Sequence, residues 1–260
     1  MANFHLEINN FLSTILPDIE LEKFDEKTVI HRSQSEKFCI ISSSLNSSPI
    51  TDKTVNDRKK TILDYQKTQY DTLVIWEDQW ISKNKIIESR LKSKLQKNRS
   101  TFARQCEVVN ISKPEAKLFL EANHLLGFLK AKYYLGLIHK GNLTAIATFG
   151  PIRTMTESQR STSSELIQFV TLPQTSVIGG LSKLIKHFYK RNKVGDLMTY
   201  IPLEWSSGAS FQRIGFKTLD TTPPLLFFSQ MGKRKKNKET PNCFDLGNFK
   251  MLLTFESPED

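Results

Sequence analysis

Residues 199–219, TYIPLEWSSGASFQRIGFKTL, restrict the fold of this chain more than any other segment. The apolar run before Glu204 predicts a strand, the small residues Ser206–Gly208 predict a tight turn, and the amphipathic stretch after them predicts a helix. Gly215 then predicts the turn into a second strand. This order indicates an α/β fold, and a turn of small residues also exposes backbone N–H groups that can bind an anion. A tight turn without a ligand needs the same residues, so both interpretations stand.

Strand and helix patterns also alternate in the first part of the chain. Apolar runs at 37–44 and 73–76 predict strands, 57–69 predicts a helix, and Ser82 is the expected N-cap of the next helix. The basic and polar segment that follows, KSKLQKNRSTFARQ, predicts a boundary. We therefore expect a small α/β module at 1–98 and a second domain at 99–260.

The second part begins with a strand near 106–110 and a helix capped by Ser112. Lys140-Gly141-Asn142 predicts a hairpin turn, because such turns need positive φ angles. A strand at 163–173 follows, and then a glycine turn leading into a helix within 176–192. The basic run GKRKKNKE predicts a loop, and the end of the chain predicts a closing hairpin around Gly247.

Charge is the most informative property of the composition. The chain has 37 Lys and Arg against 27 Asp and Glu, a net charge of +10, which favours polyanions such as DNA or RNA. A lysine-rich protein without a nucleic-acid partner has the same composition. No apolar stretch is long enough to span a membrane, and the acidic N-terminus does not resemble a signal peptide, so we expect an intracellular protein. Cys39, Cys106 and Cys243 are too few and too far apart for a disulfide framework and are expected to be buried.

Several motifs between residues 106 and 250 occur in a characteristic order: FLEANHLLGF, ATFGPIR, ELIQFVT, SVIGGLSKLIKHF, WSSGASFQRIGF and FDLGNFK. Together they resemble the GNAT-like domain of Mom-type DNA modification proteins and of homing-endonuclease-like proteins of phages and mobile elements. The resemblance implies a mixed, mostly antiparallel sheet flanked by helices. It also implies an acyl-CoA cofactor if the chain is a transferase.

The N-terminal part resembles the end of a very-short-patch-repair-like nuclease domain in LVIWEDQWISKNKIIESRLKSKL. Such nucleases hold a divalent metal on acidic residues of earlier strands. Here Ile40, Ile41 and Ser42 occupy the corresponding stretch, and His31 and Glu36 are a poor substitute set. We therefore expect no metal and no cleavage by this module.

The glycine turn VIGGLSK, residues 177–183, is the expected cofactor site. Its members are Gly179, Gly180, Ser182 and Lys183, whose backbone N–H groups and helix dipole suit a pyrophosphate. Alternatively, the two glycines only close the turn. His124 matches a motif position of the family and is expected to act as a base or metal ligand, or else to cap its helix.

Two departures from the family pattern argue against transferase chemistry. Gln168 and Pro202-Leu203 stand where relatives carry a basic residue and an aspartate. The polar groups that remain for catalysis are Glu165, Tyr200 and Ser206 beside His124, and Glu204 is a substitute only if it points into the site.

Basic residues are the expected contacts to nucleic acid. The set is Arg99, Arg104, Lys130, Lys132, Arg153, Lys233, Arg234, Lys235 and Lys236. Flexible cations of this kind neutralise phosphates without strict geometry, although a solvated charged surface looks the same in sequence.

Three functions remain open. The first is a nucleic-acid-associated phage or mobile-element protein that binds DNA, or RNA, and has lost most of its catalytic chemistry. The second is a Mom-like acyltransferase-type enzyme that modifies a DNA base. The third is an interaction subunit with a protein partner in a larger nucleoprotein assembly. All three place the protein in the cytoplasm, at the nucleoid or in a phage-infected cell, without membrane contact.

Overall fold

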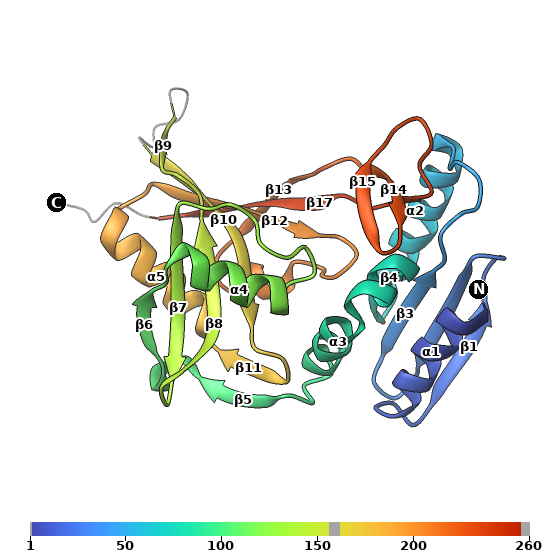
Figure 1. The fold of residues 1–260 in the computed structure, drawn as a ribbon, viewed down its shortest axis with the longest axis horizontal. Helices are drawn as coiled ribbons and strands as arrows, with labels where there is room; N and C mark the ends of the chain where they lie inside the picture. Colours follow the sequence, from blue (N-terminus) through green and yellow to red (C-terminus); the bar gives the residue numbers. More distant parts are fainter. Residues whose placement is uncertain (1, 156–161, 256–260) are drawn as a thin grey trace. The chain divides into compact units, whose positions relative to one another are not determined.

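The computed structural model describes residues 2–155 and 162–255 and divides into two compact units, each built from several chain segments (Figure 1). Unit 1 comprises Met1–Glu88, Ile201–Ser207 and Thr221–Phe249, and unit 2 comprises Ser89–Tyr200, Gly208–Asp220 and Lys250–Asp260. The domain boundary near residue 98 stays a prediction. Among the described residues, no helix is both long and apolar enough to cross a membrane.

Unit 1 contains a four-stranded sheet in the order β1-β2-β3-β4, in which β3 and β4 are parallel and the other pairs antiparallel. Strands β3 and β4 are buried almost throughout, which explains their continuous apolar sequences. The elements are α1 (Ala2–Ser13), β1 (Ile19–Lys23), β2 (Thr28–Ser33), β3 (Phe38–Ser43), α2 (Asp52–Gln66), β4 (Asp71–Trp76) and, up to Glu88, α3 (Glu77–Lys94).

Two helices of this unit begin earlier than the sequence predicts. Thr51 caps α2 by accepting the Thr54 N–H at 3.2 Å, so the helix starts at Asp52. Helix α3 starts at Glu77, and Ser82 lies inside it, where its hydroxyl donates to the Asp78 carbonyl at 2.7 Å. Ser82 is therefore not an N-cap, although the backbone does leave helical geometry at the next residue, Lys83.

A three-stranded sheet in unit 1 corrects two predictions for the C-terminal part. It has the order β15-β14-β16, built from β14 (Leu226–Gln230), β15 (Lys233–Lys236) and β16 (Cys243–Phe244). The basic run is thus an edge strand and not a loop. The closing hairpin around Gly247 is also wrong, because β16 and β17 (Asn248–Thr254) belong to different sheets.

The larger sheet confirms the predicted mixed, mostly antiparallel architecture flanked by helices. Its strand order is β13-β17-β12-β10-β8-β7-β6, with β9 beside β10, and the β10–β12 pair is parallel. The strands are β6 (Glu107–Asn110), β7 (Tyr133–His139), β8 (Asn142–Phe149), β9 (Arg153–Thr154), β10 (Thr162–Thr171), β12 (Asp196–Pro202) and β13 (Lys217–Thr221), besides β17. A separate parallel pair joins β5 (Arg99–Phe102) to β11 (Thr175–Ile178).

Helices α4 (Lys113–Asn123) and α5 (Gly180–Asn192) cover opposite faces of this sheet (Figure 1). The neighbouring residues Tyr133 and Tyr134 show why, since successive side chains of a strand point to opposite faces. Tyr133 packs edge-on against Phe188 of α5, whereas Tyr134 belongs to a core cluster with Ala116 of α4. The described residues also form two shorter helices, η1 (Ala103–Gln105) and α6 (Ala209–Gln212).

The cysteine prediction is confirmed, because Cys39, Cys106 and Cys243 are all buried and free.

Candidate functional site

The turn before α5 has the geometry of an anion site. Gly179 is the N-cap with a φ of 75°, a conformation that favours glycine, and Gly180 opens the helix. A Cβ on Gly180 would lie 3.1 Å from the Val177 side chain and 3.2 Å from that of Leu137. Within the described residues, the N–H groups of residues 180–182 have no recorded hydrogen-bond partner. These N–H groups and the positive end of the helix dipole can therefore bind a phosphate group.

Lys183, predicted as part of the same site, binds the protein itself. Its ammonium group donates to the Ala103 carbonyl at 2.9 Å and also to the Cys106 carbonyl. These bonds connect the first residue and the C-cap of η1 to the first turn of α5. The Lys183 ammonium group thus holds the turn before α5 in place through hydrogen bonds to the protein.

The β10–β12 pair opens part-way along its length. The two strands pair in parallel only from Ser163 opposite Asp196 to Leu166 opposite Thr199, although β10 continues to Thr171. The Thr199 hydroxyl donates to the Leu166 carbonyl at 2.9 Å at the last paired position, and the register between β10 and β8 shifts directly after Leu166. Beyond this point, in the described part of the chain, β12 supplies no recorded partner for the backbone of β10. We call this opening the β10–β12 seam.

Two predicted catalytic residues lie at the seam. Glu165 is on β10, one residue before the last pair, and is half-buried; burial raises the pKa of its carboxyl, while the charge of Arg153 acts in the opposite direction. Tyr200 follows Thr199 on β12 and is 40% exposed. The seam therefore carries a carboxyl group poised to accept a proton and an accessible phenol.

His124 and Gln168 form a structural clamp. The Gln168 side chain, buried on β10, donates to His124 Nδ1 at 3.0 Å and to the Gly127 carbonyl at 2.8 Å, and accepts the Leu129 N–H at 3.0 Å. The Leu126 N–H also points at His124 Nδ1, at 3.2 Å. His124 is the C-cap residue of α4 by position, and its Nδ1 accepts from Gln168 and from the Leu126 N–H; its predicted role as a base or metal ligand stays a prediction.

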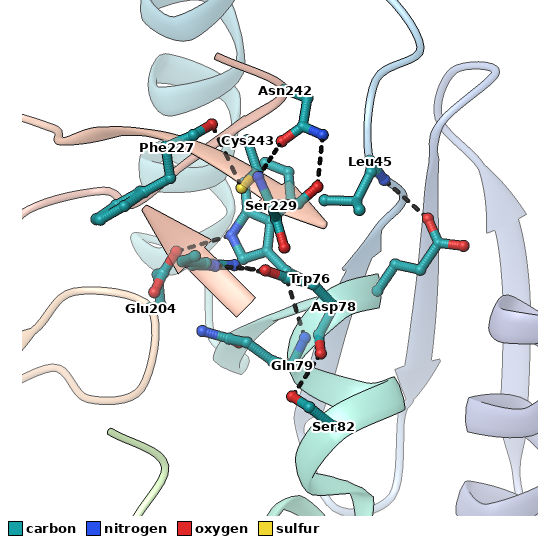
Figure 2. A network of polar contacts seen from close by, with 12 residues as sticks. Leu45, Trp76, Asp78, Gln79, Ser82, Glu204, Phe227, Ser229, Asn242 and Cys243 are labelled. Atoms are coloured by element: carbon teal, nitrogen blue, oxygen red, sulfur yellow. Dashed lines mark hydrogen bonds and ion pairs between the residues drawn. The ribbon is translucent and has the colours of Figure 1, made fainter. Parts of the chain in front are cut away.

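Ser206 and Glu204 belong to a segment of unit 1, whereas Glu165 and Tyr200 at the seam belong to unit 2. Figure 2 shows Glu204 beside Trp76, and the Trp76 indole donates to Glu204 Oε1 at 2.8 Å. Glu204 is 4% exposed, and burial raises the pKa of its carboxyl to about 7. Glu204 is thus part of the core of unit 1 and does not replace the missing aspartate.

The cations predicted to contact nucleic acid fall into two groups. Eight of the nine are exposed: Arg99, Arg104, Lys130, Lys132, Arg153, Lys233, Lys235 and Lys236. Arg234 differs, because its guanidinium makes two bonds to the buried carboxylate of Asp78, at 2.7 and 2.9 Å (Figure 2 shows Asp78). Strand alternation turns Arg234 inward between exposed lysines, so its charge serves the fold.

Unit 1 contains a histidine cluster around the buried His31 that no sequence pattern predicts. His5 Nδ1 lies 2.7 Å from the Ser42 hydroxyl, and His31 Nε2 lies 2.8 Å from the same oxygen. His5 Nε2 also lies 3.0 Å from the Ser44 hydroxyl. Among the described residues, no group of three or more His, Cys, Asp or Glu side chains is placed to hold a metal ion.

No protein-family model and no curated protein matches the chain. Among solved structures, the ribosomal-protein-S18-alanine N-acetyltransferase from Escherichia coli is 13% identical, with a TM-score of 0.41 over 60% of this chain and 97% of that one. Naa50 from Arabidopsis thaliana, in complex with a bisubstrate analogue, is 10% identical, with a TM-score of 0.40 over 58% and 99%. A GNAT family acetyltransferase from Elizabethkingia anophelis with acetyl-CoA bound is 10% identical, with a TM-score of 0.38 over 58% and 99%.

All three TM-scores lie below 0.5, so the GNAT-like fold that the motifs predict for the second half of the chain does not rest on these structures. Identities this low transfer no activity or ligand to it. The Mom-like, phage and nuclease parts of the resemblance stay predictions.

Proposed function

We propose that unit 2 binds an acyl-coenzyme A thioester and transfers its acyl group to an amine. The observation that carries this proposal is the combination of the open β10–β12 seam with the first-turn N–H groups of α5, for which the described residues supply no hydrogen-bond partner. Coenzyme A has a pyrophosphate, which suits a helix N-terminus, and an extended arm with amide groups, which suits an unpaired strand edge.

The half-buried carboxyl of Glu165 supports a role in the transfer step. The amine attacks the thioester carbonyl, the C–S bond breaks, and Glu165 takes the proton that the amine loses. Tyr200, at the same seam, can return a proton to the departing thiolate. His124 is not required, because its Nδ1 is already hydrogen-bonded.

The proposal predicts that Ser182→Glu lowers the affinity for coenzyme A at least tenfold, about 1.4 kcal/mol, by placing a carboxylate beside the pyrophosphate. A carboxylate in the first turn interacts favourably with the positive end of the helix dipole, so the substitution should not lower the stability of the fold. Ser182→Gln, of similar size but neutral, is the matched control and should bind coenzyme A like the wild type. Isothermal titration calorimetry measures both affinities. Equal coenzyme A binding by all three proteins would contradict the proposal.

We further propose that the acceptor amine belongs to a nucleic acid, with DNA as the first candidate. The net charge of +10 and the exposed lysines of β15 support this choice. Two other functions stay predictions: a DNA-binding protein without catalytic activity, and an interaction subunit of a larger assembly. Absence of acyl transfer would favour either of them.

Replacing Lys233, Lys235 and Lys236 together with serine should weaken DNA binding. The slope of the logarithm of the association constant against the logarithm of the salt concentration should become shallower by about 0.9 for each phosphate that the variant no longer neutralises. The control is a second triple variant, in which serine replaces the exposed residues Lys113, Lys117 and Lys140 and the same amount of charge is removed elsewhere. Fluorescence anisotropy at several salt concentrations gives both slopes. If the two triple variants behave alike, β15 does not contact nucleic acid and its lysines only protect a sheet edge.

A further inference from the structure

Strand β1 of unit 1 takes no part in the functions proposed above, and its outer side is open. It is the first strand in the order β1-β2-β3-β4, and in the described part of the chain β2 is the only strand that pairs with it (Figure 1). Ile19 is partly buried, and the other four residues of β1 are exposed. A free strand edge of this kind is a template for a further strand.

The register shows which backbone groups of β1 bond to β2. The Phe24 N–H donates to the Thr28 carbonyl at 3.1 Å, so these two residues form a hydrogen-bonded pair. Such pairs recur at every second residue of an antiparallel ladder, and the β1–β2 register continues without a shift through the whole of β1. The backbone groups of Glu22 and Glu20 therefore bond to β2.

The backbone N–H and C=O groups of Ile19, Leu21 and Lys23 consequently point away from β2. The β2–β3 pair agrees with this assignment, because the Ser44 N–H donates to the Lys27 carbonyl at 2.8 Å. In β2, odd-numbered residues therefore bond to β3 and even-numbered residues bond to β1. Three consecutive outward positions of β1 are thus ready to pair with an added strand.

The side chains along this edge are mainly acidic. Residues 18–26, DIELEKFDE, contain five carboxylates and one amine in a chain whose net charge is +10. Glu20 and Glu22 share one face of β1 and are exposed, although Arg32 lies 3.2 Å from Glu22 and neutralises part of this charge. Leu21, on the other face, is 54% exposed. The edge therefore offers a negative face and an apolar contact.

A second copy of β1 is a poor occupant of this edge. In the antiparallel pairing that a symmetric dimer would use, the outward residues Ile19, Leu21 and Lys23 must lie opposite one another. Glu20 and Glu22 would then also lie opposite glutamates, and like charges directly across a ladder are destabilising. Charge complementarity favours a strand with cations at alternate positions.

We propose that β1 binds an extended peptide of another protein, which adds an antiparallel strand to the sheet. Two lysines or arginines of this peptide face Glu20 and Glu22, and the apolar residue between them lies opposite Leu21. Main-chain bonds to the outward groups of β1 supply affinity, and the alternating cations supply specificity.

Two labelled peptides, STKVKTS and STEVETS, test the proposal with the full-length protein. Fluorescence anisotropy should show that the lysine peptide binds at least tenfold more tightly than the glutamate peptide. The net charge of +10 would by itself favour the glutamate peptide, so a preference for lysine reports the local charge of β1.

Reversing the charge of the edge should reverse this preference. The test variant carries Glu20→Lys together with Glu22→Lys, and it should bind the glutamate peptide more tightly than the lysine peptide. The control carries Glu107→Lys together with Glu239→Lys, which change the same charge at exposed positions elsewhere. This control should keep the wild-type preference for lysine.

A proline at position 21 tests the backbone contribution separately. Leu21→Pro removes an N–H that points outward, so the β1–β2 bonds stay intact, and proline is tolerated on edge strands in this orientation. It should weaken binding of the lysine peptide at least tenfold and leave the melting temperature nearly unchanged. Leu21→Val keeps the N–H and should bind like the wild type. If Leu21→Pro does not fold, the charge reversal still decides.

Three results would overturn the proposal. The first is equal binding of the two peptides by the wild type, and the second is binding of neither. The third is self-association, measured by analytical ultracentrifugation, that the double substitution of Glu20 and Glu22 abolishes, because a second copy of the chain would then occupy the edge.

Discussion

Replacing Arg234 with methionine is expected to lower the free energy of unfolding by about 3–5 kcal/mol, the usual cost of removing one partner of a buried ion pair. Asp78 is left behind with a side chain that is 1% exposed and has lost two hydrogen bonds. Burial acts to raise the pKa of Asp78, but the bonds and charge of Arg234 outweigh it and lower that pKa overall. Without Arg234, the carboxylate must remain charged and unpaired or take up a proton. Urea denaturation at neutral pH measures the loss.

Lys235→Met is the matched control, because it removes the same charge one residue further along β15 from an exposed side chain. Its effect should stay within about 0.5 kcal/mol, as is usual for surface positions. If the two variants are equally stable, the ion pair contributes little. Arg234 would then again be a candidate for phosphate contact.

Arg234 also illustrates what the sequence cannot supply. Strand alternation within the basic run turns Arg234 inward, but the sequence does not show that the run is a strand. Its partner Asp78 lies 156 residues away, and no local pattern links the two. Gln168 is a similar case, because an apparent loss of a charged residue proves to be the anchor of the loop after α4.

Local signals, in contrast, could be interpreted correctly. Ser112 caps α4 by accepting the Glu115 N–H at 3.4 Å, and Lys140 and Gly141 turn the β7–β8 hairpin with φ angles of 49° and 79°. Caps and tight turns depend on neighbouring residues only. Gly247 also has a positive φ, 86°, yet it connects strands of two different sheets. The turn could be predicted from the glycine, but the strand partners could not.

The histidine cluster depends on tertiary burial in the same way and gives unit 1 a response to acid. His31 is 0% exposed, and its second ring nitrogen, Nδ1, is buried without a partner. Burial lowers the pKa of His31 to about 3, and the charge of the nearby His5 acts in the same direction. The pKa of His5 is itself lowered by burial, although the charges of Glu77 and Asp25 act against this. The folded state thus keeps His31 neutral at pH values where the unfolded chain binds a proton.

The free energy of unfolding should therefore be insensitive to His31 above pH 6.5 and fall between pH 6.5 and about 3, by up to about 1.4 kcal/mol per pH unit. From about pH 7.5 to about pH 5 the loss is about 2 kcal/mol. His31→Leu cannot titrate, so its unfolding free energy should change by about 2 kcal/mol less over this interval, as measured by urea denaturation. His139→Gln, a partly exposed position on β7, should keep the pH response of the wild type. The carboxylates contribute equally in all three proteins, so they do not affect the comparison. A His31→Leu variant that is as acid-sensitive as the wild type would contradict the prediction, because it would mean that the His31 imidazole accepts a proton in the folded state.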